Sequence, residues 1–212
     1  TDESFAIALK NEELHRRIEK CKTMRLNSKK GATRKLAAFP YKFGEIRYKE
    51  SECIIIPAVS SERREYIPIG YLKAGVVVSN SAFAVYDAPL WLFSILTSKM
   101  HMAWVKTIGG RLETRYRYSA QLCYNTFPFP SINDAQREEL EALAQEVLDI
   151  RDQHFDMTLG EMYNPESMPE DLREAHQRLD LAVDSWYRPE PFASDEERLE
   201  CLFKLYTKMI KK

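Results

Sequence analysis

The hydrophobic pattern of this chain changes its period at Pro130, and this change constrains the fold more than any other feature. Before Pro130, short β-branched and aromatic segments alternate with polar or turn residues, which is typical of the strands of a sheet. Three such segments are CIIIPAV at 53–59, YIPIGYL at 66–72 and GVVVSNSAFAVYDA at 75–88. After Pro130 the apolar residues follow helical spacing, as Leu140, Leu143, Val147 and Ile150 do. The sequence therefore predicts an α+β chain, with a mixed, sheet-containing domain over residues 1–130 and an all-α helical bundle over residues 131–212.

Helix boundaries are marked by capping residues on both sides of Pro130. Residues 88–106 contain Pro89 near their start, are apolar around most of their circumference and precede Gly109-Gly110, so they predict one packed core helix. A polar helix over 11–25 is expected to lead into the sheet domain. Three helices are expected in the bundle, and their predicted start signals are Ser131 or Asn133, then Pro169, then Ser194.

The net charge of −1 hides an asymmetry between the two halves of the chain. Residues 1–130 carry 21 Lys+Arg against 12 Asp+Glu, whereas residues 131–212 carry 10 against 20. A basic half joined to an acidic half suggests that the first part binds a polyanion, although an undirected drift of charge along the chain gives the same count.

Several classes of protein are disfavoured by composition. The apolar runs are far shorter than the roughly 20 residues of a membrane span, and Thr1 does not open a secretion signal, so we expect a cytoplasmic protein that does not insert into membranes. The four cysteines are far apart, which indicates reduced thiols, and neither they nor the four histidines have metal-site spacing. No phosphate-binding loop, GxSxG, HExxH or glycine-rich cofactor turn occurs, so we expect no catalytic residue and no metal ligand in this chain.

Two groups of residues are candidates for binding DNA. The segment KTMRLNSKKGATRK is read as a flexible stretch whose cations hold phosphates, with a solvated loop as the alternative; its candidate residues are Lys22, Arg25, Lys29, Lys30, Arg34 and Lys35. Farther along, a strand is expected to carry Glu113, Arg115 and Arg117 on one face.

This mixed-charge face has the residue types that read a C·G base pair. Arginine can donate two hydrogen bonds to guanine O6 and N7, and glutamate can accept one from the N4 amine of cytosine. A strand whose charges pair with neighbouring strands is the alternative. The aromatic residues that follow, Tyr124, Phe127 and Phe129, are assigned to packing and not to stacking on bases.

Most of the chain, and most strongly the part from Ser79 onward, resembles the C-terminal portion of the MmeI-like, single-chain type IIL restriction-modification enzymes. The motifs that carry the resemblance occur in order: Gly-Gly-Arg, Arg-Tyr-Ser and Tyr-Asn-x-Phe-Pro-x-Pro within 109–130, then Met-Pro and Ala-His-x-x-Leu-Asp within 168–180. The resemblance implies a fragment of a longer polypeptide, comprising a target recognition domain and a C-terminal helical domain. The nuclease and the adenine-N6 methyltransferase, with S-adenosylmethionine and Mg²⁺ as cofactors, would lie upstream, and none of these cofactors would bind this fragment.

The resemblance also implies roles for particular residues. It makes Glu113, Arg115 and Arg117 the leading base-reading candidates, with Ser81 and Ala82 as weaker ones. Arg111 of the Gly-Gly-Arg motif is a further candidate for binding phosphate. The implied partners are double-stranded DNA and the upstream domains. The competing hypothesis is a structural or protein-interaction domain whose acidic helices dock a partner without base readout.

Overall fold

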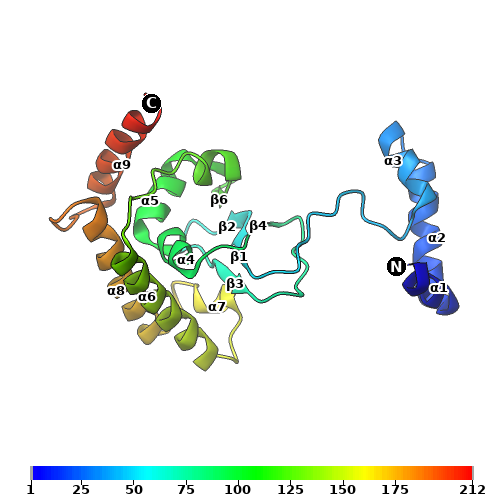
Figure 1. The fold of residues 1–212 in the computed structure, drawn as a ribbon, viewed down its shortest axis with the longest axis horizontal. Helices are drawn as coiled ribbons and strands as arrows, with labels where there is room; N and C mark the ends of the chain where they lie inside the picture. Colours follow the sequence, from blue (N-terminus) through cyan, green and yellow to red (C-terminus); the bar gives the residue numbers. More distant parts are fainter. Residues whose placement is uncertain (1, 212) are drawn as a thin grey trace. The chain divides into compact units, whose positions relative to one another are not determined.

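The computed structural model describes residues 2–211, and the chain divides into two compact units, residues 1–48 and residues 49–212. The elements of both are labelled in Figure 1.

The N-terminal unit is helical. It contains α1 (Asp2–Lys10), α2 (Glu12–Leu26), α3 (Gly31–Lys35) and the short 3-10 helix η1 (Leu36–Ala38). Asn11 caps α2 by accepting a 3.1 Å hydrogen bond from the Leu14 amide, and α2 confirms the helix expected over 11–25. The expectation of a flexible basic stretch over 22–35 is wrong, because its residues form the end of α2, a short link and α3.

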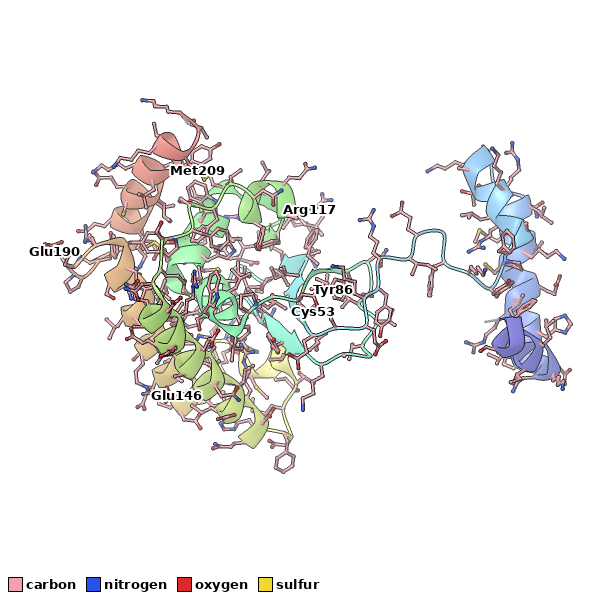
Figure 2. The ribbon with its side chains drawn as sticks, in the orientation of Figure 1. Cys53, Tyr86, Arg117, Glu146, Glu190 and Met209 are labelled. Atoms are coloured by element: carbon pink, nitrogen blue, oxygen red, sulfur yellow. The ribbon has the colours of Figure 1, made fainter. Side chains whose placement is uncertain are left out.

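The main unit begins with two small antiparallel sheets. In the first, β1 (Cys53–Pro57) lies between β3 (Gly70–Leu72) and β4 (Ala82–Tyr86), so that Cys53 is opposite Tyr86 at one end of the pair (Figure 2). In the second, β6 (Arg115–Arg117) lies between β2 (Val59–Ser60) and β5 (Gly110–Leu112).

The packed helix expected over 88–106 is present as two helices, α4 (Leu90–Thr97) and α5 (Lys99–Ile108). The single helix was a wrong prediction because Ser98 has an extended backbone, with φ −78° and ψ 162°, and its hydroxyl accepts from the His101 amide as the cap of α5. A short π-helical turn, η2 (Ala120–Tyr124), follows β6.

The expected helices after Pro130 are confirmed. They are α6 (Asp134–Gln153) capped by Asn133, α8 (Glu170–Tyr187) preceded by Pro169, and α9 (Asp195–Met209) capped by Ser194, with the four-residue α7 (Leu159–Met162) between the first two. None of the described helices has the length and apolar character needed to cross a membrane.

Sheets and helices of the main unit share one hydrophobic core. Its fully buried side chains come from β1, the α4–α5 pair and the later helices, including Ile54, Trp104, Leu140 and Leu179. The Ser94 hydroxyl donates to the Leu140 carbonyl at 2.7 Å, which joins α4 to α6 inside this core. The α+β class is confirmed, and a domain boundary at residue 130 stays a prediction.

Candidate nucleic-acid interface

The base-reading candidates from Arg111 to Arg117 lie on one β-hairpin, which we call the recognition hairpin (residues 110–117). Strands β5 and β6 pair with Leu112 opposite Arg115 and Gly110 opposite Arg117, so the loop between them has two residues, Glu113 and Thr114. Side chains directly opposite one another share a face of the sheet. Arg115 and Arg117 therefore share a face with Leu112, and all three are exposed.

Glu113 is at the tip of this hairpin and not within a strand. It has φ +58°, a left-handed conformation that is uncommon for residues other than glycine but suits a two-residue hairpin loop. The prediction that Glu113 shares a strand face with Arg115 and Arg117 is therefore wrong at Glu113, where the chain reverses direction. The predicted alternation holds at Arg115, Tyr116 and Arg117, whose burial alternates exposed, buried, exposed.

The tip brings a cation and an anion together. Arg115 Nη2 donates to Glu113 Oε2 at 2.6 Å, and the two side chains keep 46% and 77% of their exposure. Both groups therefore remain accessible to another molecule while each holds the other in a defined orientation. Arg117 forms no side-chain hydrogen bond or ion pair within the described part of the chain, and Figure 2 shows it at the periphery of the main unit.

Arg111 is on the opposite face of the hairpin from Arg115. It is paired with Tyr116, lies 4.3 Å from the centre of the Tyr116 ring and donates a 2.9 Å hydrogen bond to the Lys106 carbonyl. Tyr116 is buried, so this face is turned toward the protein. Arg111 itself is exposed, so it supports the hairpin through these contacts while its role as a phosphate contact stays a prediction.

Ser81 and Ala82 lie near the hairpin because Ala58 is hydrogen-bonded both to Ser81 and to the residue that follows β6. The Ala58 amide donates to the Ser81 carbonyl at 2.9 Å, and the Ala58 carbonyl accepts from the Tyr118 amide at 2.9 Å. Ser81 and the end of β6 are thus two strand spacings apart, or about 10 Å. Ser81 is exposed, and Ala82 is partly buried as the first residue of β4.

The predicted phosphate-binding residues of the N-terminal unit differ in availability. Lys29, Lys30 and Lys35 are exposed, and their side chains have no hydrogen-bond or ion-pair partner among the described side chains of residues 4–211. Lys22 forms an exposed ion pair with Glu19 at 3.8 Å. Arg34 is exposed but donates to the carbonyls of Ser28 and Lys29.

Arg25 does not have the environment of a phosphate ligand. It is 9% exposed, and its guanidinium donates to the carbonyls of Leu36, Phe39 and Lys42 at 2.7 to 2.9 Å. These bonds fasten the end of α2 to the chain that follows α3. The prediction that Arg25 binds phosphate is therefore corrected, because its guanidinium is buried and already donates to three backbone carbonyls.

The sequence interpretation missed Glu62, an exposed carboxylate beside the hairpin tip. Its pKa is lowered, first by a backbone amide hydrogen bond, then by a hydrogen bond from the Thr114 side chain and by the charges of Arg115 and Arg63. The Tyr116 hydroxyl also lies 3.5 Å from the Glu62 carbonyl. Nothing in the local sequence points to this residue, because it is about fifty residues from the hairpin along the chain.

The aromatic residues after the hairpin pack against one another. Phe127 is buried, and its ring centre lies 5.0 Å from that of Phe129, which in turn lies 5.5 Å from that of Tyr124. His101 contacts Phe127 edge to face and lies 3.0 Å from the Tyr118 hydroxyl. Burial lowers the pKa of His101 to about 3, so this histidine is neutral and structural.

Comparison with known proteins finds a matching family model for each of the two parts of the chain. Residues 1–131 match the family model described as the target recognition domain of MmeI, and residues 132–212 match the one described as the MmeI C-terminal domain. The chain is 46% identical over 196 residues to DNA methyltransferase A of Bacillus subtilis (strain 168), an alignment that covers 92% of the chain and 22% of that protein.

A solved structure agrees with these matches. The chain is similar to the type IIL restriction-modification enzyme MmeI in complex with DNA, with a TM-score of 0.87 and 39% identity, over 92% of the chain and 26% of that structure. The chain thus spans about a quarter or less of the length of both relatives. The two family models together account for residues 1–212, and the chain therefore belongs to the MmeI family, as a target recognition domain followed by a C-terminal domain.

Proposed function

We propose that this chain is the DNA sequence-recognition part of a type IIL restriction-modification enzyme and that the tip of the recognition hairpin reads bases. The observation that carries the proposal is the exposed pair of Arg115 and Glu113 at the tip of the β5–β6 hairpin, where only two strands extend beyond the pairing of β2 with Tyr116 and Arg117. The major groove of B-DNA is wide enough to admit such a ribbon. Membership of the MmeI family and the similarity to MmeI bound to DNA support the same function.

The chemistry of the tip suits one base pair in particular. An arginine that donates to guanine O6 and N7 and a glutamate that accepts from cytosine N4 together satisfy both edges of a C·G pair. Arg115 would exchange its contact with Glu113 for contacts with the bases. The carboxylate then contributes selectivity more than affinity, because among phosphates it costs free energy unless a base donor pairs with it.

The remaining candidates fit supporting roles. Arg117, Ser81 and Ala82 extend the exposed surface beside the tip, and Lys29, Lys30 and Lys35 offer unpaired cations to phosphates. Lys22 and Arg34 are exposed enough to add to that set. Contacts with phosphates would add affinity without sequence preference.

Adenine methylation and DNA cleavage are assigned to upstream domains of the full-length protein, with S-adenosylmethionine and Mg²⁺ as their cofactors. The chain covers only 22% of DNA methyltransferase A, which leaves room for such domains in a protein of similar length. Among the described residues, no three His, Cys, Asp or Glu side chains are grouped to hold a metal ion. We infer a cytoplasmic site of action, where bacterial DNA is found.

The test is made on the full-length protein. Its methylated adenines are mapped by sequencing DNA from cells that express either the unmodified protein or a variant in which Glu113 and Arg115 are exchanged as a pair. A methylation motif that changes at one base pair supports base reading by the tip. An unchanged motif with reduced activity shows that the hairpin is structural, and absence of any motif from the unmodified protein favours the protein-interaction hypothesis.

A further inference from the structure

Residues 62–66, which we call the bridging segment, connect the recognition hairpin to the helices that follow Pro130. The segment begins two residues after Ser60, which pairs with Tyr116 of the hairpin. Its first residue, Glu62, contacts the hairpin through its carbonyl, which lies 3.5 Å from the Tyr116 hydroxyl, and through its carboxylate, which interacts with Thr114.

The next four residues each bind a different position between 160 and 180. Arg63 forms an ion pair with Glu166, and Arg64 donates to the Gly160 carbonyl at 3.0 Å. Glu65 accepts from Arg173 at 2.6 Å, and the Tyr66 hydroxyl donates to Asp180 at 2.6 Å. The partners of all four residues thus lie in or between α7 and α8. A segment fixed by four consecutive side chains has little freedom to move independently of these helices.

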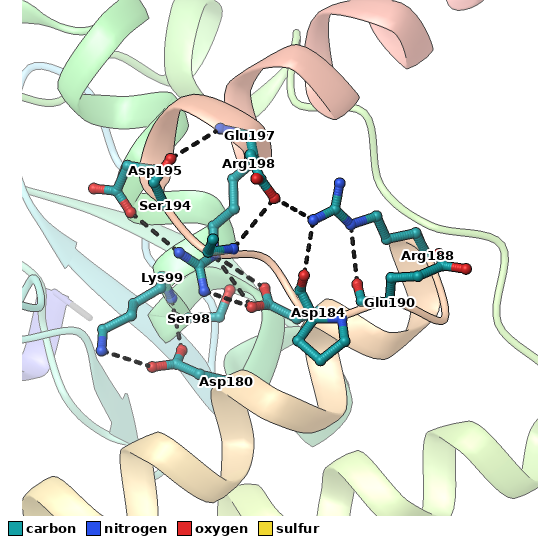
Figure 3. Close-up of polar contacts among 12 residues, drawn as sticks. Ser98, Lys99, Asp180, Asp184, Arg188, Glu190, Ser194, Asp195, Glu197 and Arg198 are labelled. Atoms are coloured by element: carbon teal, nitrogen blue, oxygen red, sulfur yellow. Dashed lines mark hydrogen bonds and ion pairs between the residues drawn. The ribbon is translucent and has the colours of Figure 1, made fainter.

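Asp180 also binds helix α5, which leads into the first strand of the hairpin. Its second carboxylate oxygen accepts a 2.7 Å hydrogen bond from the amide of Lys99, the first residue of α5, and the two side chains are drawn side by side in Figure 3. Helix α5 ends at Ile108, directly before Gly109 and the first hairpin strand. Lys99 Nζ lies 3.0 Å from Glu65 and so joins α5 to the bridging segment. One cluster therefore binds both the bridging segment, which contacts the hairpin at Thr114 and Tyr116, and the first turn of α5, the helix that leads into the first hairpin strand.

The hairpin needs such support. Each of its strands has three residues, and among its residues only Tyr116 is buried. Isolated two-stranded hairpins are at best marginally stable in water. Discrimination between bases also requires donor atoms placed to within about 0.5 Å, which needs a rigid surrounding shell.

We propose that the bridging segment positions the recognition hairpin for base discrimination by fastening it to α7 and α8, and that Arg173 is a positioning residue for specificity although it lies outside the hairpin. This inference rests on the proposed function of the hairpin. It assigns to the helices after Pro130 a part in sequence selection. Arg173 is the site to test because it is 25% exposed, and its removal leaves Glu65 paired with Lys99.

The experiment compares Arg173→Ala with Arg178→Ala in the full-length protein. Both arginines are on α8 and both form a 2.6 Å ion pair with a glutamate, but Arg178 binds Glu146 of α6 and, among the described residues, forms no ion pair or hydrogen bond with the bridging segment. Affinity is measured for a duplex that carries the methylation motif of the unmodified protein, for duplexes with one base pair changed, and for random-sequence duplex. Hydrogen exchange of the amides in 110–117 is measured on the same samples.

We expect Arg173→Ala to lower discrimination at the base pair read by the tip by about 2- to 10-fold and to speed hairpin exchange, with random-sequence binding unchanged. Arg173→Lys is expected to restore part of the discrimination, and Arg178→Ala to change neither quantity. Equal losses on all duplexes, or no change in discrimination, would overturn the inference. If Arg115→Ala alters discrimination and Arg173→Ala does not, only this inference fails; if the unmodified protein does not discriminate at all, the proposed function fails with it.

Discussion

The Tyr66 hydroxyl donates a 2.6 Å hydrogen bond to the carboxylate of Asp180, and both residues are buried. Burial raises the pKa of Asp180 to about 7, although the hydrogen bonds from Tyr66 and the Lys99 amide and the charge of Lys99 act in the opposite direction. An aspartate in the unfolded chain has a pKa of about 3.9. Folding therefore favours the protonated form of Asp180 between these two values.

The first prediction concerns the pH dependence of stability. Stabilisation by protonated Asp180 is complete below about pH 4 and is lost as pH rises through about 7. We expect the free energy of unfolding of Asp180→Asn, relative to the unmodified chain, to rise between about pH 4.5 and about pH 8. Urea unfolding at both pH values measures this difference.

Two buried histidines also make the stability of the chain depend on pH, and their contribution has to be separated from that of Asp180. Burial lowers the pKa values of His101 and His176, so their contribution has the opposite sign and is lost as pH falls below the unfolded histidine value of about 6.5. Because both chains contain these histidines, their effect cancels in the difference. A difference that stays constant with pH would show that Asp180 does not titrate in this range.

Gly109 provides the second prediction. A Cβ atom at this position would lie 2.5 Å from the Val105 carbonyl oxygen and 3.3 Å from Cys123 Sγ, whereas one at Gly110 would be 3.8 Å from its nearest neighbour, an ordinary contact. We expect Gly109→Ala to reduce the free energy of unfolding by about 1 to 3 kcal/mol and Gly110→Ala to reduce it much less. Thermal unfolding of the two variants tests this, and similar losses at both sites would contradict the steric argument.

Local signals in the sequence were sufficient for most of the helices. Asn133, Pro169 and Ser194 mark helix starts because a cap or a helix-initiating proline acts within a few residues of itself. The break at Ser98 was missed because the apolar pattern continues through it. Its hydroxyl caps α5 only because the Ser98 backbone is extended, and the sequence pattern does not show that conformation. Glu113 was placed in a strand because alternation does not show where a hairpin reverses.

The sequence predicted the types of residue in the candidate site, but it did not predict the long-range contacts that hold the hairpin in place. Arg115 and Arg117 were identifiable from their spacing, since exposed and buried residues alternate in a half-buried strand. Arg25 was misassigned because a buried arginine that binds carbonyls cannot be distinguished in sequence from a solvated one. The pairs Glu65–Arg173 and Tyr66–Asp180 join residues more than one hundred positions apart, so no local pattern could reveal them.

The third prediction concerns Lys29 and Lys30, which are exposed and have no side-chain partner in the described part of the chain. If each contacts a phosphate, Lys29→Ala and Lys30→Ala in the full-length protein should weaken binding to motif and random DNA alike. Each should also reduce the slope of log affinity against log salt by about 1. Binding is measured across a salt series with both duplexes. A loss confined to the motif duplex, or an unchanged slope, would remove these lysines from the phosphate-binding set.

The last prediction separates base reading by Arg115 from the general attraction of its positive charge to DNA. Arg115→Ala in the full-length protein should reduce discrimination at one base pair by about 1 to 3 kcal/mol, because the bidentate contact to guanine is lost while phosphate contacts remain. Arg137→Ala is the matched control, since Arg137 has a similar side-chain exposure of 48%, against 46% for Arg115, and also pairs with a carboxylate, that of Asp134. Affinities are measured for the motif duplex, its single-pair variants and random DNA. Arg137→Ala should leave the discrimination unchanged, whereas equal losses from Arg115→Ala on motif and random DNA would mean that Arg115 contributes charge alone and that the base-reading surface lies elsewhere.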